Sequence, residues 1–105
     1  MAGLSPTQLT LRELRKQGYT AAVTERWNPF ARIRQDLFGF VDVLGVGEKG
    51  TLAVQATSDS HVSERVKKIA DCEHIGAVRE AGWQIEVWGW KKVKNKWQCR
   101  VVDVS

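Results

Sequence analysis

The succession of apolar and polar positions predicts a helix at the start of the chain. Ser5 fits the N-cap, Pro6 fits the first helical position, and Gln8 completes a capping box. Gly18 supplies the left-handed residue that commonly ends a helix. We therefore expect a helix over residues 5–17.

Three stretches rich in β-branched, aromatic and aliphatic residues then predict strands. The first covers residues 19–27, after which the sequence NPFARIRQ predicts a loop. The second and third cover residues 38–46 and 51–57, with a glycine-containing turn between them. Both are apolar on both faces, so we expect them to lie centrally in the sheet.

Helical spacing of apolar residues returns after the third predicted strand. Val62, Val66 and Ile69 recur at i, i+4 and i+7, and the preceding Ser and Asp residues can cap a helix. We therefore expect a helix to begin near His61. Its apolar stripe continues toward Gly82, with a break expected near Asp71.

The sequence WQIEVWGWKKVKNKWQCRVVDV predicts a β-hairpin that turns at Lys94 and Asn95. The expected element order is αβββαββ, which corresponds to the α/β class with an α+β mixed sheet flanked by helices. The chain has 105 residues, of which 43% are hydrophobic, and this suits one modest core. A single domain over residues 1–105 is expected.

Composition narrows the class of protein further. No apolar run approaches the roughly 20 residues of a membrane-spanning helix, and the sequence MAGLSPTQ lacks signal-peptide features. We expect a cytoplasmic protein without a membrane partner. Cys72 and Cys99 are too few for a disulfide framework, and Cys72 with His74 lacks a zinc spacing. The formal net charge of +4 suits a polyanionic partner, but many proteins without such a partner carry a similar charge.

Two polar residues interrupt the apolar strands. Asp42 falls within the predicted strand over residues 38–46, where a carboxylate is costly unless it is paired or binds a metal. Gln55 falls near the end of the next strand, where it is either a hydrogen-bonded interior amide or part of a site. Because side chains alternate along a strand, Gln55 and Thr57 share a face.

The stretches FVDVLG and LAVQATS carry an acid, a glycine turn and a triplet similar to acid-x-Lys, and together they resemble the PD-(D/E)XK nuclease superfamily. The opening helix with QGYTAAVTERW is similar to archaeal-type Holliday junction resolvases, over about residues 5–90. The resemblance implies a restriction-endonuclease-like core and a Mg²⁺- or Mn²⁺-dependent endonuclease that cuts branched DNA as a homodimer. Asp42 matches the metal-binding Asp, Gln55 the second acid, and Thr57 the lysine.

The resemblance is incomplete at the lysine position. Thr57 lacks the cation that would orient the attacking water and stabilise charge on the phosphate. Candidates for its replacement are His61, Arg65, Lys67 and Lys68, and the spacing does not choose among them. Asp42, the amide oxygen of Gln55 and Asp36 are the candidate metal ligands, because Mg²⁺ prefers oxygen donors. Glu25 is expected to be a strand-surface charge.

Basic clusters supply candidate DNA contacts. RWNPFARIR interleaves arginines with aromatic residues, which suits phosphate contact with base stacking but equally a surface loop anchored by aromatics. KKVKNK would attract a nucleic-acid backbone, or serve solubility and block edge pairing. The nucleic-acid-binding candidates are Arg26, Arg32, Arg34, Lys67, Lys68, Lys91 and Lys92.

Three other functions fit the same sequence. The first is a catalytically inactive nucleic-acid-binding module of the same fold, which the substitutions at Gln55 and Thr57 favour. The second is a double-stranded-RNA-binding domain, which shares the order αβββα. The lysines of RVKKIA are similar to those at the start of the second helix of such domains. The Trp-rich hairpin and Asp42 argue against that one. The third is a purely structural protein.

Overall fold

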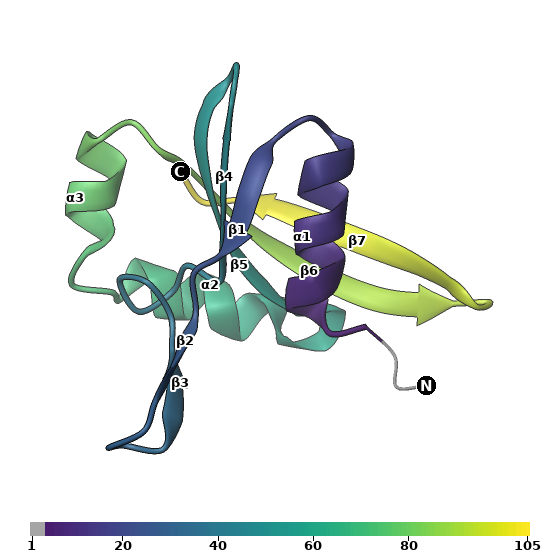
Figure 1. The fold of residues 1–105 in the computed structure, drawn as a ribbon, viewed down its shortest axis with the longest axis horizontal. Helices are drawn as coiled ribbons and strands as arrows, with labels where there is room; N and C mark the ends of the chain where they lie inside the picture. Colours follow the sequence, from purple (N-terminus) through teal and green to yellow (C-terminus); the bar gives the residue numbers. More distant parts are fainter. Residues whose placement is uncertain (1–3) are drawn as a thin grey trace.

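In the computed structural model, which describes residues 4–105, helices cover both faces of a mixed β-sheet (Figure 1). The described helices are α1 (Pro6–Lys16), α2 (Val62–Ala70) and α3 (Ile75–Glu80), with a 3-10 helix, η1 (Asp59–His61), leading into α2. The described strands are β1 (Thr20–Val23), β2 (Arg26–Asn28), β3 (Ile33–Gln35), β4 (Val43–Gly47), β5 (Gly50–Ser58), β6 (Gln84–Val93) and β7 (Lys96–Asp103). The expected mixed α+β architecture is confirmed.

The main sheet has the strand order β1-β4-β5-β6-β7. Its pairs are antiparallel except for β5 and β6, which run parallel. Parallel neighbours need a crossover connection, and η1, α2 and α3 form it here. Strands β2 and β3 pair with each other in a separate two-stranded hairpin. The expected central position of β5 is confirmed.

The start of α1 follows the predicted capping. Ser5 Oγ accepts a hydrogen bond from the backbone N–H of Gln8 at 3.2 Å, and Gly18 has a φ of +98° beyond the last turn. On its inner face α1 buries Leu14 against the sheet. The buried hydroxyl of Thr10 accepts a hydrogen bond from Trp90 Nε1 at 2.9 Å, which joins α1 to β6. Local sequence and long-range packing therefore agree in this helix.

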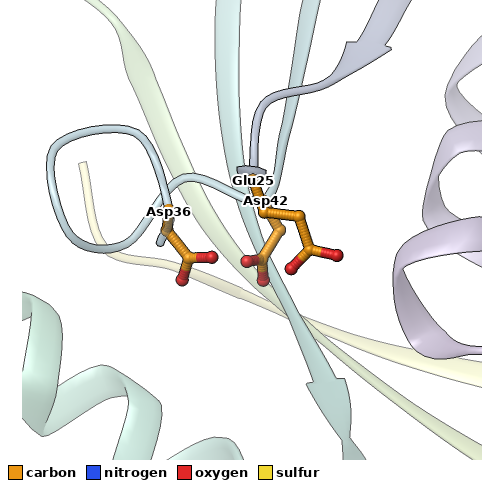
Figure 2. Close-up of side chains that lie close together, drawn as sticks. All are labelled: Glu25, Asp36 and Asp42. Carbon is orange, nitrogen blue, oxygen red and sulfur yellow. The ribbon is translucent and has the colours of Figure 1, made fainter. Parts of the chain in front are cut away.

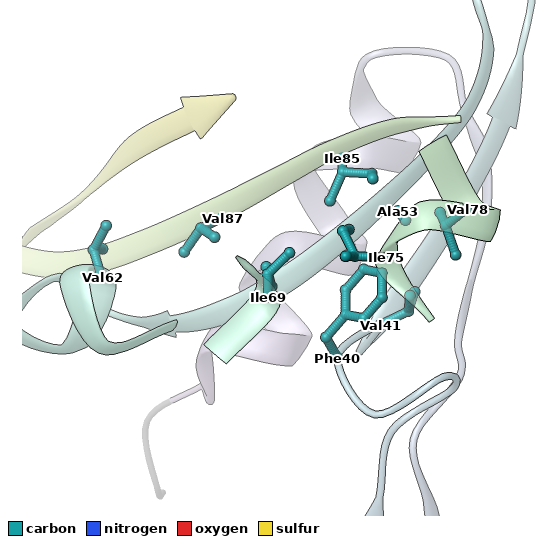
Figure 3. Close-up of a cluster of buried hydrophobic side chains, with 9 residues drawn as sticks. All are labelled: Phe40, Val41, Ala53, Val62, Ile69, Ile75, Val78, Ile85 and Val87. Carbon is teal, nitrogen blue, oxygen red and sulfur yellow. The ribbon is translucent and has the colours of Figure 1, made fainter. Parts of the chain in front are cut away.

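The opposite face of the sheet is covered by α2 and α3. Alternate residues of β5 face opposite helices, with Leu52 packing on the α1 side and Ala53 on the other. The hydrophobic core between this face of the sheet and these helices contains Phe40, Val41, Ala53, Val62, Ile69, Ile75, Val78, Ile85 and Val87 (Figure 3). A β-carbon at Gly89 would collide with the Val62 side chain, so glycine at this position lets α2 lie directly on β6.

The predicted first strand, residues 19–27, is wrong in its extent. The chain leaves the main sheet after Thr24, whose N–H still donates to the Asp42 carbonyl and whose hydroxyl donates to the Val41 carbonyl. It then pairs with β3 as β2, so the predicted loop NPFARIRQ is largely a hairpin. The side chain of Asn28 accepts hydrogen bonds from two backbone N–H groups of the turn and thereby stabilises it.

The predicted second strand, residues 38–46, begins too early. Phe38 and Gly39 have φ values of +55° and +84° and form a tight turn, which a continuous strand would not allow. Strand β4 begins at Val43, so Asp42 immediately precedes the strand, and the prediction that it lies within the strand is wrong.

Several other expectations are confirmed. A break separates α2 from α3 after Ala70, and Lys94 and Asn95 form the β6–β7 turn with the positive φ values such turns require. Cys72 and Cys99 are both free thiols. Among residues 4–105, no helix is both long and apolar enough to cross a membrane.

Candidate functional site

Two of the carboxylates at the candidate site are positioned by the base of the β2–β3 hairpin. Arg26 pairs with Gln35, so the adjoining residues Glu25 and Asp36 flank the base of the hairpin. The turn that follows Asp36 then returns the chain to the main sheet at Asp42. One carboxylate oxygen from each of Glu25, Asp36 and Asp42 lies within 4.8 Å of the others (Figure 2). We call these three residues the acidic triad.

Asp42 is the buried member of the acidic triad, with 4% of its surface exposed. Its backbone N–H donates to the Val54 carbonyl at 2.9 Å, which extends the β4–β5 pairing by one residue. One carboxylate oxygen, Oδ2, accepts two hydrogen bonds, from the Ala56 backbone N–H at 2.8 Å and from Gln55 Nε2 at 2.6 Å. The carboxylate is therefore held in one orientation by the strand beside it.

The pKa of Asp42 is raised from its ordinary value of 3.8 to about 8, and burial is the largest cause. A hydrogen bond and charge repulsion from Asp36 and repulsion from Glu25 contribute to this rise, while the Ala56 N–H opposes it. The site thus holds more negative charge than its surroundings stabilise. A proton or a cation at the acidic triad would relieve this repulsion.

The raised pKa predicts that the free energy of unfolding falls as pH rises from about 4 to about 8 when no cation is added. Across this range the folded protein keeps a proton on Asp42 that the unfolded chain releases, so this contribution is present at low pH and lost through the folded pKa. Thermal unfolding in EDTA across this range, with wild type and Asp42→Asn compared, isolates the contribution. Parallel pH profiles for the two proteins would contradict it.

Lys68, on α2, brings a cation to the acidic triad. Its ammonium Nζ lies 3.6 Å from Asp36 Oδ2 and 3.4 Å from Gln55 Oε1. The neighbouring Ile69 is fully buried against the sheet, which fixes the part of α2 that carries the lysine. Among the proposed replacements for the missing lysine, Lys68 makes these contacts, whereas His61, the last residue of η1, pairs with Glu64 in the first turn of α2.

Gln55 joins Lys68 to Asp42 through the two ends of its buried amide. The oxygen faces Lys68, and the nitrogen donates to Asp42. Ligation of a metal by the amide oxygen would require the amide to turn over, which would place its NH₂ group against the ammonium. The metal-ligand role of Gln55 stays a prediction, as does the catalytic role of Thr57, which is buried two residues farther along β5.

An open cavity of about 820 Å³ adjoins the acidic triad. Its lining includes Asp36 and Lys68 together with Arg26 and Arg34 from the hairpin. Arg34 Nη1 also lies 3.7 Å from Glu25 Oε1. Cationic groups therefore lie beside two of the three carboxylates, with Lys68 next to Asp36 and Arg34 next to Glu25.

The remaining basic candidates lie apart from this cavity lining. Arg32 is in the turn of the β2–β3 hairpin, and Lys67 is exposed on α2. Lys91 and Lys92 are exposed near the β6–β7 turn, which projects in a different direction from the β2–β3 hairpin (Figure 1). Their DNA-binding roles stay predictions.

The expectation that Glu25 is a strand-surface charge is wrong, because its side chain is only 21% exposed and belongs to the acidic triad. The sequence contained a usable signal, since Asn28 and Pro29 mark a turn between two short β-prone segments. A hairpin across that turn would have placed Glu25 opposite Asp36.

Comparison of the chain with protein-family models, with curated proteins and with solved structures found no match. The resemblance to PD-(D/E)XK nucleases therefore rests on the motif residues themselves. The structural features that bear on function are the acidic triad, Lys68 and the adjoining cavity.

Proposed function

We propose that the protein is a metal-dependent DNA endonuclease of the PD-(D/E)XK type with a restriction-endonuclease-like core. The observation that carries the proposal is the acidic triad, whose carboxylate oxygens lie within 4.8 Å of one another beside the ammonium of Lys68. The element order supports it, because, apart from the inserted β2–β3 hairpin and the additional helix α3, it follows the expected order αβββαββ.

The donor set of the acidic triad fits a hard divalent cation such as Mg²⁺ or Mn²⁺. All three side chains offer carboxylate oxygens, which are the ligands that these ions prefer. Burial and the neighbouring carboxylates raise the pKa of Asp42, and a bound cation would offset both effects. When bound, the ion would polarise a phosphodiester and lower the pKa of a bound water.

The chain's own residues supply the other parts of such a site. Lys68 would stabilise negative charge on the phosphate, which is the role of the lysine of the acid-x-Lys triplet in the nucleases that the chain resembles. Arg26 and Arg34 would hold neighbouring phosphates at the cavity wall. Gln55 would keep the Asp42 carboxylate in one orientation through its short hydrogen bond.

A nucleic-acid-binding module without chemistry is the second candidate, and one observation favours it. Gln55 Nε2 donates to Asp42 and Lys68 pairs with Asp36, so the protein's own groups already neutralise part of the site. The nuclease is the better proposal because three carboxylates converge at the site, and Lys68 contacts Asp36 alone among them. Branched DNA as substrate and a homodimer that cuts two strands follow from the resemblance and are part of the proposal.

Cleavage of an end-labelled four-way junction and a matched linear duplex, with Mg²⁺, Mn²⁺ or EDTA, tests the proposed function. We expect metal-dependent cleavage that Glu25→Gln reduces by about tenfold or more, because the substitution removes one carboxylate of the acidic triad. Glu48→Gln, in the exposed β4–β5 turn, is the matched control and should cut normally. Salt-sensitive binding without cleavage under either metal would favour the binding module instead.

A further inference from the structure

The β2–β3 hairpin exposes apolar side chains. It pairs with no strand of the main sheet and projects away from the body of the protein (Figure 1). The exposed fractions are 98% for Phe30, 54% for Trp27 and 50% for Ile33. Between residues 26 and 35 the sequence has three arginines and no acidic residue. A surface that combines exposed aromatics with three arginines, of which Arg34 is paired with Glu25 at the base of the hairpin, indicates a polyanionic partner.

The tip of the hairpin is a defined turn. Asn28 Oδ1 accepts hydrogen bonds from the backbone N–H groups of Phe30 at 3.0 Å and Ala31 at 3.1 Å. Its Nδ2 donates to Gln35 Oε1 at 3.2 Å, which ties the turn to β3. These contacts fix the backbone of the turn from which the exposed Phe30 ring projects, so a ligand that covers the ring would not have to order the turn first.

The base of the hairpin adjoins the acidic triad. Glu25 directly precedes β2, Asp36 directly follows β3, and Arg34 Nη1 lies 3.7 Å from Glu25. At about 3.3 Å per residue, Phe30 lies on the order of 15 Å from Glu25, a length of about four base steps. A nucleic acid held at the acidic triad could therefore reach the tip along the arginine-bearing strands.

We propose that the β2–β3 hairpin recognises DNA with unstacked bases, as at a branch point or an unpaired stretch, next to the position of cleavage. Phe30 stacks on an exposed base face, and Arg26, Arg32 and Arg34 contact the flanking phosphates. Intact duplex has its base faces covered by neighbouring bases, so it offers the arginine contacts without the stacking. The assignment of the neighbouring position as the site of cleavage rests on the proposed function.

Binding without divalent metal tests the hairpin separately from cleavage. Fluorescence anisotropy in EDTA would compare a duplex with an unpaired bulge and a matched continuous duplex, using wild type, Phe30→Leu and Phe30→Trp. We expect Phe30→Leu to weaken binding to the bulged DNA by about tenfold and to the continuous duplex by less than about twofold, while Phe30→Trp keeps the preference. Val101→Ala removes apolar surface from β7 and should change neither affinity.

Equal effects of Phe30→Leu on both DNAs, or none on either, would overturn the proposal. Sedimentation of the same variants addresses a different partner, because conversion of a dimer to a monomer by Phe30→Leu would make the hairpin a contact between copies of the chain and also overturn it. Metal-dependent cutting without a Phe30-dependent preference would reject the hairpin's role alone. The preference without any cutting would reject the nuclease alone.

Discussion

Asp42→Asn is expected to reduce metal-dependent cleavage by at least about a hundredfold and yet to make the metal-free protein more resistant to heat at about pH 8. The substitution removes the central carboxylate of the acidic triad while keeping the shape of the side chain. It also removes a charge that burial and the neighbouring Asp36 make unfavourable, as the raised pKa of Asp42 shows. Loss of activity with gain of stability would identify a residue retained for function.

Two measurements on the same preparations check this expectation. Cleavage of a four-way junction reports activity, and thermal unfolding with and without Mg²⁺ reports metal binding, because an ion that binds only the folded state raises stability. Mg²⁺ should stabilise wild type but not Asp42→Asn. Asp71→Asn, an exposed change at the end of α2, is the control and should behave like wild type.

A different result would assign Asp42 a structural role. If Asp42→Asn unfolds at a lower temperature than wild type in EDTA, the carboxylate contributes to stability through its bonds to Gln55 and Ala56. If Mg²⁺ stabilises both proteins equally, the ion binds elsewhere. The first outcome would contradict the expected gain in stability, and the second would contradict the proposed metal site.

Lys68→Met is expected to lower cleavage by about a hundredfold while leaving stabilisation by Mg²⁺ intact or increased. The ammonium lies 3.6 Å from Asp36 and competes with a cation for that carboxylate, so its removal should not weaken metal binding. The loss should appear in the rate of cutting at saturating DNA, because the proposed role is to stabilise charge in the transition state. Single-turnover cleavage and Mg²⁺-dependent unfolding together separate the two effects.

The adjacent Lys67 provides the matched control for this change. It lies on the same helix and is exposed, so Lys67→Met makes the same change in net charge away from the acidic triad. Lys68→Arg should recover part of the activity, because it restores the positive charge with a different shape. Equal losses in Lys67→Met and Lys68→Met would indicate general attraction of DNA and refute a specific role for Lys68.

Local sequence was sufficient to predict the backbone conformation wherever neighbouring residues determine it. The cap at Ser5, the turn at Lys94 and Asn95 and the break after α2 each depend on a few adjacent residues, and each was predicted in its proper place. Strand boundaries around Glu25 and Asp42 were not predicted well. There the chain passes between two sheets, and the choice of pairing partner depends on residues that are distant in the sequence.

The candidate site was likewise predicted only in part from the sequence. Asp42 and Gln55 were recognisable from the sequence alone, because a polar residue in an apolar strand carries a desolvation cost that calls for a partner. Their pairing, the inclusion of Glu25 and the selection of Lys68 over Lys67 could be seen only in the folded chain. These contacts join a hairpin base, a strand and a crossover helix, and side-chain alternation within one element does not specify how separate elements approach one another.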